Sequence, residues 1–298
     1  MKKDSVHAAI RNAILATRSD VVAIVLFGSL ARGEPYHDID VLVVVDKLDK
    51  GMLERSQDML ALGNALALPV PSEVLIYSRE ECEQGFKSHL PLFLNIAADG
   101  RVLYDTGFIT PLIKAVRDEL RRRGVERTVT GGWRFPVRYR QSVPFSSMES
   151  RDWATLWLDD AARDLTAAEN LLQGRIFDKC VTHCQQTAEK AVKAVLACFG
   201  LLERTHYVAS ILAQECRTHT SGQWQERLLE LANQARSLEP DATLTRYPGI
   251  YHGEIWVPAK EYDEARAVRA IAIARRALQI AQEFVGWWFA TPSEGEKG

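Results

Sequence analysis

The chain has 298 residues, with 37 Lys and Arg against 39 Asp and Glu, so its formal net charge is −2. This length favours two domains, and the near-neutral charge disfavours a protein dedicated to binding nucleic acid. A hydrophobic fraction of 47% and a charged fraction of 26% are ordinary for a globular protein, which disfavours a disordered or fibrous chain.

The first part of the chain alternates between strand and helix patterns. Two apolar runs rich in Val and Ile, Val21–Phe27 and Val41–Val45, are typical of buried strands. Helices are predicted over residues 4–17, 50–66, 92–98 and 110–123, strands at Val74–Tyr77 and Arg101–Tyr104, and a helix-opening capping box at Ser78–Glu81. This order predicts an α/β (α+β) domain with a small mixed sheet under helical cover.

Four residues between the first two predicted strands are the main candidates for a functional site. Gly28 and Ser29 can turn into a helix whose first amides and hydroxyl meet a phosphate. Asp38 and Asp40 point the same way because side chains alternate along a strand, and two such carboxylates repel each other unless a cation lies between them. The pattern indicates nucleotide chemistry; the alternative is a helix cap beside a turn at the strand edge.

These residues form a recognisable signature. Gly28-Ser29-Leu30-Ala31-Arg32-Gly33 followed by Asp38-Ile39-Asp40 resembles the motif of the DNA polymerase β-type nucleotidyltransferase superfamily, and most closely its minimal nucleotidyltransferase branch. The resemblance covers the first third of the chain. It implies that Gly28, Ser29 and Arg32 bind the phosphates of ATP or another nucleoside triphosphate, although Arg32 could equally be a surface residue. It also implies that the two Asp residues bind Mg²⁺.

The family also uses a third carboxylate on a neighbouring strand. Glu73, at the start of the third predicted strand, is the candidate here, where family members often have Asp. It would bind metal or deprotonate the acceptor hydroxyl; the alternative is a solvent-facing Glu. The resemblance thus implies a Mg²⁺-dependent transfer of a nucleoside monophosphate, expected to be AMP, from a nucleoside triphosphate to a hydroxyl of a protein or nucleic-acid acceptor.

Residues 124–149 read as an Arg-rich linker, because Gly and Pro interrupt any regular pattern. The arginines at positions 117, 121, 122, 123, 127, 134, 138 and 140 are interleaved with three aromatic residues. Arginines beside aromatics suit a groove for nucleic acid or polyphosphate. The alternative is a solvated helix end followed by a basic connector.

Residues 150–290 show helical periodicity almost throughout, which predicts an antiparallel bundle of four to five helices. The expected helices run from Trp153 to Leu172, from Phe177 to Phe199, and over about 206–216, 222–238 and 260–289. Trp287-Trp288-Phe289 is expected to be exposed and to suit a homodimer interface. Residues 291–298 are expected to form a flexible tail.

The helical half resembles the HEPN domain, a helical domain often found beside minimal nucleotidyltransferases. The resemblance rests on Trp157–Leu172, on His183–Leu196 with its Gln-Gln-x-x-Glu-Lys stretch, and on Thr245–Gly249. Many HEPN domains are ribonucleases with an Arg-x4–6-His motif, and Arg246 and His252 have that spacing. Arginine would hold the scissile phosphate while histidine exchanges a proton.

The same resemblance implies a toxin–antitoxin type of module. In such pairs the nucleotidyltransferase modifies a Tyr just after the motif histidine of its HEPN partner. Here Tyr247 and Tyr251 lie inside the motif instead, and the next Tyr after His252 is Tyr262. Self-modification at Tyr247 or Tyr251 is therefore an open alternative.

Three other functions stay open. The first is a HEPN ribonuclease regulated by its nucleotidyltransferase domain. The second is an aminoglycoside-type nucleotidyltransferase, although acidic residues in the second half do not cluster and the linker is basic. The third is a nucleotide-binding scaffold without catalysis.

The expected domains are residues 1–123, the nucleotidyltransferase domain, and residues 150–290, the HEPN-like helical bundle.

The expected location is the cytoplasm. No run approaches the roughly 18–20 apolar residues of a membrane span, and Met1–His7 is not followed by the apolar core of a signal peptide. The five cysteines form no Cys-x-x-Cys pair, so buried reduced thiols are expected.

Overall fold

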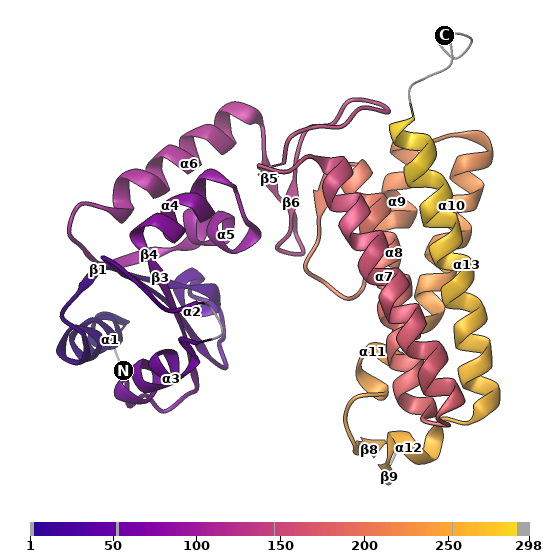
Figure 1. The fold of residues 1–298 in the computed structure, drawn as a ribbon, viewed down its shortest axis with the longest axis horizontal. Helices are drawn as coiled ribbons and strands as arrows, with labels where there is room; N and C mark the ends of the chain where they lie inside the picture. Colours follow the sequence, from indigo (N-terminus) through magenta and orange to yellow (C-terminus); the bar gives the residue numbers. More distant parts are fainter. Residues whose placement is uncertain (1–2, 52–53, 146, 252, 291–298) are drawn as a thin grey trace. The chain divides into compact units, whose positions relative to one another are not determined.

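The computed structural model describes residues 3–51, 54–145, 147–251 and 253–290. The chain divides into two compact units, Met1–Arg122 and Arg123–Gly298 (Figure 1). The first is a small mixed sheet with helices and the second is largely helical, which confirms the predicted fold class. Residues 124–149, predicted as a linker, belong to the second compact unit. The predicted domain bounds, 1–123 and 150–290, remain a proposal.

The elements of the first unit are α1 (Lys3–Thr17), β1 (Val21–Phe27), α2 (Gly28–Arg32), β2 (Ile39–Val45), α3 (Ser56–Ala65), β3 (Ser72–Ser78), α4 (Arg79–Lys87), α5 (Pro91–Asp99), β4 (Arg101–Asp105) and α6 (Ile109–Arg123). Helix α3 begins at Ser56, six residues later than predicted, and Met52 and Leu53 lie outside the described residues.

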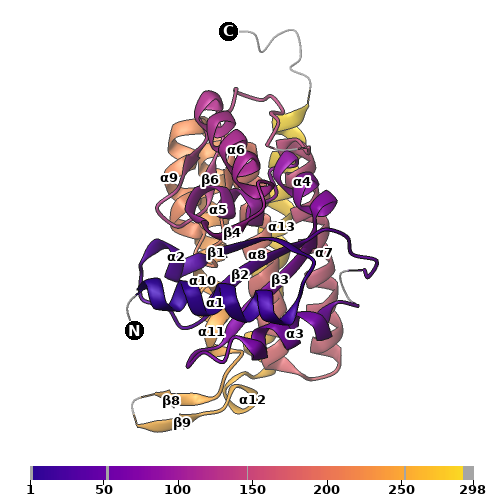
Figure 2. The same ribbon diagram turned by 90° about the vertical axis from the view of Figure 1, so that its left-hand side faces the viewer.

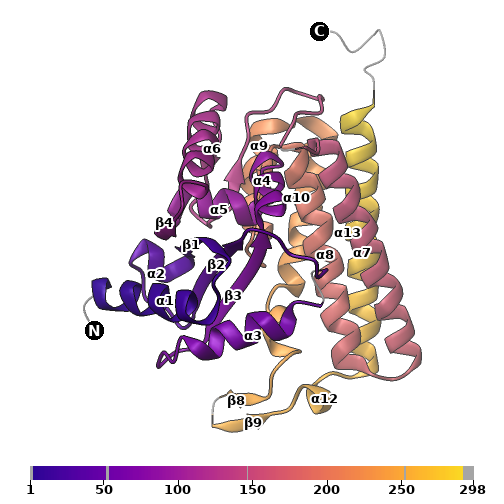
Figure 3. The same cartoon turned by 60° about the vertical axis from the view of Figure 1, so that its left-hand side comes forward.

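The strands of the first unit lie in the order β3-β2-β1-β4. Strand β1 pairs antiparallel with β2 and β4, and β2 pairs parallel with β3. A parallel pair needs a crossover connection, which the segment carrying α3 provides. Because β1 runs opposite to β2 and β3, its C-terminal end lies where those two strands begin. Figure 3 shows α2 following β1 at that end of the sheet.

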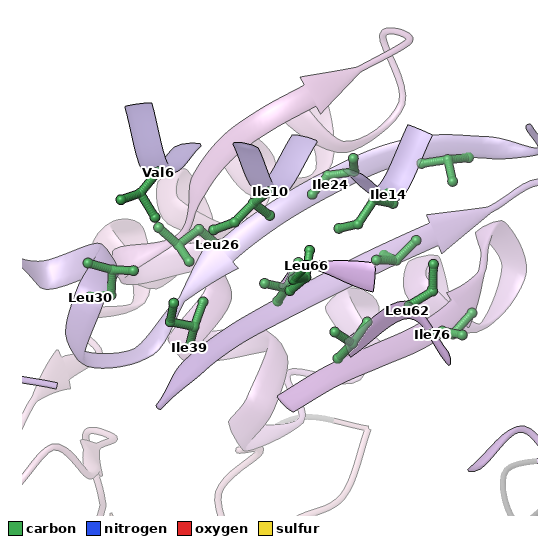
Figure 4. Packing of buried hydrophobic residues seen from close by; sticks show 14 of the residues in the cluster. Val6, Ile10, Ile14, Ile24, Leu26, Leu30, Ile39, Leu62, Leu66 and Ile76 are labelled. Atoms are coloured by element: carbon green, nitrogen blue, oxygen red, sulfur yellow. The ribbon is translucent and has the colours of Figure 1, made fainter. Parts of the chain in front are cut away.

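Both faces of the sheet are covered, which explains why every residue of β1 is buried. Val6, Ile10 and Ile14 recur at four-residue steps on α1 and belong to one apolar cluster with Ile24 and Leu26 of β1 (Figure 4). Each such side chain contributes about 1.5–3 kcal/mol when fully buried. On the opposite face, α4 contacts β2 and β3, and α5 contacts β1.

The predicted capping box at the start of α4 is confirmed. Ser78 Oγ accepts from the Glu81 amide at 3.2 Å, and the Ser78 amide donates to Glu81 Oε2 at 2.9 Å. Arg55, only 2% exposed, donates to Glu81 Oε1 at 2.6 Å and to the Ile76 carbonyl at 2.9 Å. The cap is thereby tied to β3. The sequence pattern did not indicate the role of Arg55.

The elements of the second unit are β5 (Glu126–Arg127), β6 (Trp133–Arg134), α7 (Ser150–Gln173), α8 (Phe177–Cys198), β7 (Leu201–Leu202), α9 (Ala209–His219), α10 (Gly222–Leu238), α11 (Asp241–Leu244), β8 (Gly249–Tyr251), β9 (Glu254–Trp256), α12 (Pro258–Glu261) and α13 (Glu264–Phe289). Helices α7, α8, α10 and α13 form the core of the bundle, with α7, α8 and α13 running side by side (Figures 1 and 3).

Several details of this unit differ from the prediction. The linker carries two short strands, β5 and β6, and β6 also pairs with β7. Strands β8 and β9 form a hairpin that the helical pattern did not predict (Figure 2). The last helix begins only at Glu264, because the Asp263 side chain caps it by accepting from the Arg266 amide at 2.8 Å.

The expected exposure of Trp287-Trp288-Phe289 is wrong for its central residue. Trp288 is 0% exposed, and its ring centroid lies 5.3 Å from that of Phe199 and 5.6 Å from that of Phe284. Such aromatic pairs stabilise a core beyond their buried area. Trp288 therefore belongs to the bundle core and offers no dimer surface.

All five cysteines are free and buried, as predicted. In the part of the chain that the structure describes, no helix is both long and apolar enough to cross a membrane.

Candidate active site

The candidate site lies where β1 ends and where β2 and β3 begin. Asp40 is the register partner of Phe27 on β1 and of Glu73 on β3. Ile39 and Val41 belong to the apolar cluster on one face, so Asp40 lies on the other face. The same alternation places Glu73 on the face of the sheet away from Val74, which belongs to the apolar cluster. Asp40 and Glu73 therefore stand side by side on one face of the sheet.

The two carboxylates differ in their access to solvent. Glu73 is exposed and Asp40 is half-buried. Asp38 precedes β2 and is also exposed. Neighbouring carboxylates on adjacent strands repel each other, and a divalent cation relieves that repulsion. Among the described residues, no set of three or more His, Cys, Asp or Glu side chains is gathered closely enough to form a metal site.

Gly28 packs directly against Asp40. Its φ is +74°, a left-handed conformation that glycine adopts readily. A Cβ atom at position 28 would lie 1.9 Å from Asp40 Oδ2, so no larger residue fits without moving the carboxylate. The turn that ends β1 thus brings its backbone against the carboxylate of β2. Glycine at such a position allows this close approach of backbone to a neighbouring group.

The short helix α2 closes the turn. Gly33, at φ +80°, ends it, and the Glu34 amide donates to the Ser29 carbonyl at 3.0 Å. Ser29 itself is half-buried at the start of this helix.

Arg32 is engaged by two carboxylates. Its Nε donates to Glu34 Oε2 at 2.8 Å, and its NH1 lies 3.4 Å from Asp99 Oδ2 on α5. The bond to Glu34, with the charge of Asp99, raises the pKa of Arg32 above its usual value. Sequence reasoning missed both partners, and the contact with Asp99 could not be found from local spacing.

In the helical unit, the structure describes Arg246 but not its predicted partner, because His252 lies outside the described residues. Arg246 follows α11, and the two carbonyls before it are held from elsewhere. Lys179 Nζ donates to the Thr245 carbonyl at 2.9 Å, and Trp256 Nε1 donates to the Leu244 carbonyl at 2.9 Å. The backbone that carries Arg246 is therefore anchored on both α8 and β9.

The arginines of the predicted basic groove are mostly used within the fold. Their partners are the Ala97 and Ala98 carbonyls for Arg117, Asp118 for Arg121, the Pro144 carbonyl for Arg123, Glu215 for Arg134, and the Trp287 carbonyl for Arg140. Arg127 lies over the ring of Trp133. This pattern favours a basic connector over a nucleic-acid groove.

Comparisons with known proteins match both halves of the chain. A HEPN domain model matches residues 154–287, and a nucleotidyltransferase domain model matches residues 10–104. The curated protein "Putative toxin MJ1304" of Methanocaldococcus jannaschii is 35% identical over 136 residues, which are 45% of this chain and 88% of that protein.

Among solved structures, the archaeal HEPN homologue ST0689 is similar with 28% identity and a TM-score of 0.35, over 44% of this chain and 97% of that one. The protein TT1696 from Thermus thermophilus has 23% identity and a TM-score of 0.37, over 44% and 96% of the two chains. A tri-AMPylated Shewanella oneidensis HEPN toxin in complex with MNT antitoxin has 20% identity and a TM-score of 0.26, over 41% and 92%.

Both predicted resemblances are thereby confirmed at the level of family. The chain belongs to the HEPN family, carries a nucleotidyltransferase domain ahead of its HEPN domain, and is a nucleotidyltransferase.

Proposed function

We propose that this protein transfers a nucleoside monophosphate, AMP, from ATP to a hydroxyl group of an acceptor, in a Mg²⁺-dependent reaction. The observation that carries the proposal is the pairing of Asp40 with Glu73 on one face of the sheet, with Gly28 against Asp40. A turn that cradles phosphate beside two carboxylates suits nucleotidyl transfer.

Each residue of the site has one role in the proposal. Gly28 and Ser29 hold the β- and γ-phosphates, and Asp38 and Asp40 hold Mg²⁺. When bound, Mg²⁺ neutralises the triphosphate and stabilises the leaving pyrophosphate. Arg32 is a further candidate for phosphate binding, although Glu34 and Asp99 already engage it.

Glu73 acts on the acceptor. Its carboxylate takes the proton of the acceptor hydroxyl as the hydroxyl oxygen bonds to the α-phosphorus and the bond from that phosphorus to the pyrophosphate oxygen breaks. Glu73 suits this role because its exposed position leaves room for an acceptor. It is also a candidate third metal ligand.

A protein hydroxyl is the acceptor that we favour. The relative from Methanocaldococcus jannaschii carries the name "Putative toxin MJ1304", which suits a toxin–antitoxin module in which one protein is modified to control its activity. Tyr247 of this chain is 67% exposed and follows Arg246 directly, so a phenolic hydroxyl is available in the HEPN domain itself. A homodimer formed through the helical domain would let one chain modify the other.

The experiment is incubation with each α-labelled nucleoside triphosphate and Mg²⁺, alone and with RNA, with pyrophosphate release measured in parallel. We expect label on protein from ATP, lost in Asp38→Ala and retained in His252→Ala. Omission of Mg²⁺ should also abolish the label. Label that persists in Asp38→Ala, or no pyrophosphate release by the unmodified chain, would contradict the proposal.

A second candidate is ribonuclease activity of the HEPN domain, regulated by the first domain. The anchoring of the Arg246 backbone by Lys179 and Trp256 favours it, because a phosphate-binding arginine needs a fixed position. RNA cleavage lost in Arg246→Ala and His252→Ala, but kept in Asp38→Ala, would support this candidate. Equal cleavage by all three variants would refute it.

A further inference from the structure

Helix α2, which begins with Gly28 and Ser29, is held at its other end by a residue far away in the sequence. The helix has five residues, and so short a helix is not stable without outside contacts. The last carbonyls of a helix have no partner within it. The Ser29 and Leu30 carbonyls accept from amides just past the helix. The Ala31 carbonyl accepts instead from Arg101 Nε of β4, at 2.5 Å. Arg101 therefore ties the C-terminal end of α2 to the sheet.

Asp99 holds the same end of α2 through a second contact. Arg32 is the last residue of the helix, and its NH1 lies 3.4 Å from Asp99 Oδ2. The Asp99 side chain is 16% exposed, so dissolved salt screens this attraction less than it screens one on the open surface. Cations at the C-terminal end of a helix also interact favourably with its dipole. The residues on either side of Gly100 thus engage two consecutive residues of α2.

The segment that makes both contacts, Asp99–Arg101, is packed against β1. Arg101 is the register partner of Leu26, so β4 begins beside the end of β1, where α2 starts. A Cβ on Gly100 would lie 2.9 Å from Val25 Cγ1, closer than real Cβ contacts. Glycine thereby lets this backbone approach β1 closely. The residues that hold α2 are therefore fixed against the strand that leads into it.

We propose that Asp99 and Arg101 are positioning residues for nucleotidyl transfer, which hold α2 so that Gly28 and Ser29 meet the phosphates; the proposal rests on the proposed function. Groups that bind a substrate must be held within about 0.5 Å by the residues behind them. Arg101 acts through its Nε hydrogen bond, so an uncharged donor in the same place should replace it. Asp99 acts by holding Arg32. Its removal should therefore weaken phosphate binding, whereas relief of simple charge repulsion would strengthen that binding.

Isothermal titration of the full chain with inorganic tripolyphosphate and Mg²⁺ tests this proposal, with kcat/KM for ATP measured by pyrophosphate release. Two variants of Arg101 separate its hydrogen bond from its charge, because Gln has an N–H donor at the position of the Arg Nε and Met has none. We expect weaker tripolyphosphate binding by Arg101→Met and a loss of about tenfold to hundredfold in its kcat/KM, as for a misplacement of about 1 Å. Arg101→Gln should retain most of both, and Asp99→Leu should resemble Arg101→Met.

The matched control is Arg18→Met, at the other end of β1, where Arg18 pairs with Asp20. It should bind tripolyphosphate as the unmodified chain does. Arg101 is exposed, and changes at exposed positions usually alter stability little, so we expect its variants to fold. Circular dichroism checks the fold of each variant, and Asp99→Leu tests the same end of α2 independently of Arg101.

Three outcomes would overturn the assignment. One is tripolyphosphate binding by Arg101→Met that equals that of the unmodified chain. Another is equal weakening in Arg101→Gln and Arg101→Met, which would mean that the charge of Arg101 contacts phosphate directly. The third is tighter binding by Asp99→Leu, which would mean that this carboxylate only repels the anion. Failure of the proposed function is seen separately, as absence of pyrophosphate release by the unmodified chain, a result that involves neither residue.

Discussion

Gly28 and Asp40 are in such close contact that the space between them cannot hold a methyl group: a Cβ on Gly28 would lie 1.9 Å from Asp40 Oδ2. Gly28 directly follows β1 and Asp40 lies on β2, and their contact joins the proposed phosphate cradle to the proposed metal ligand. Glycine is required here for two reasons, its left-handed φ and its missing side chain.

Gly28→Ala should therefore displace the Asp40 carboxylate and lower nucleotidyl transfer by at least about tenfold, since displacement of a catalytic group by about 1 Å can cost a hundredfold. The matched control is Gly107→Ala. Gly107 also has a left-handed φ, +96°, but a Cβ there would meet nothing within 4 Å. Both variants bear the backbone strain of roughly 1 kcal/mol, and only the first should lose transfer. Equal activities, measured with α-labelled ATP, would refute the role of this contact.

Asp40→Asn and Glu73→Gln test the paired carboxylates. Loss of a metal ligand should abolish measurable transfer in Asp40→Asn. Loss of the general base should slow Glu73→Gln by about 10²–10⁴-fold. Neither change should destabilise the fold, because each removes like-charge repulsion. Asp46→Asn, just past the other end of β2, is the control. Undiminished pyrophosphate release by Glu73→Gln would show that Glu73 is a solvent-facing residue with no part in the reaction.

In the first unit, the sequence predicts the elements whose signals lie within a few neighbouring residues. Two Val-rich runs bounded by Gly and Asp predicted β1 and β2, and a capping box predicted the start of α4, because each of these signals lies within a few residues. The neighbouring positions of Asp40 and Glu73 could only be expected by resemblance. Their register depends on a parallel pairing between segments far apart in the chain, and no local pattern encodes it.

In the helical half, the sequence predicts the helices but not which of their residues are buried together. Its helices were readily predicted from periodicity, but Trp288 was expected outside and lies inside. A terminal Trp-Trp-Phe run looks exposed when its partners, Phe199 and Phe284, are not known to converge on it. The β8–β9 hairpin was missed because Ile250 and Ile255, which pair across it, are 75% and 77% exposed and lack the alternation of a half-buried strand.

The Gln-Gln-x-x-Glu-Lys stretch is built into a buried polar cluster. Glu189 accepts from Lys193 Nζ and from Gln185 Nε2, both at 2.9 Å, and lies 3.0 Å from His206 Nδ1. Lys193 and Glu189 are each 7% exposed. A buried ion pair is costly to break because the remaining charge is left without compensation.

Lys193→Met should accordingly destabilise the helical unit by about 3–5 kcal/mol. All seven tryptophans lie in the second unit, so tryptophan fluorescence during urea unfolding reports that unit alone. Lys260→Met, which changes an exposed lysine in the same unit, should alter stability by no more than about 0.5 kcal/mol. Equal midpoints for the two variants would contradict the structural role of the cluster.

The same cluster predicts how stability depends on pH. Burial alone would raise the pKa of Glu189, but the charge of Lys193 and hydrogen bonds from Lys193, Gln185 and His206 outweigh it and lower that pKa below its usual value. The unfolded state therefore binds the proton more readily, so the contribution of Glu189 to stability is present above its unfolded pKa of about 4.3 and is lost as pH falls through the folded pKa.

Urea unfolding followed by tryptophan fluorescence at pH 7, 5, 4 and 3 should show the helical unit losing stability in acid. Glu189→Gln does not titrate, so its stability should fall less over this range, although it is lower at pH 7. Parallel pH profiles for the two proteins would show that Glu189 does not carry this dependence.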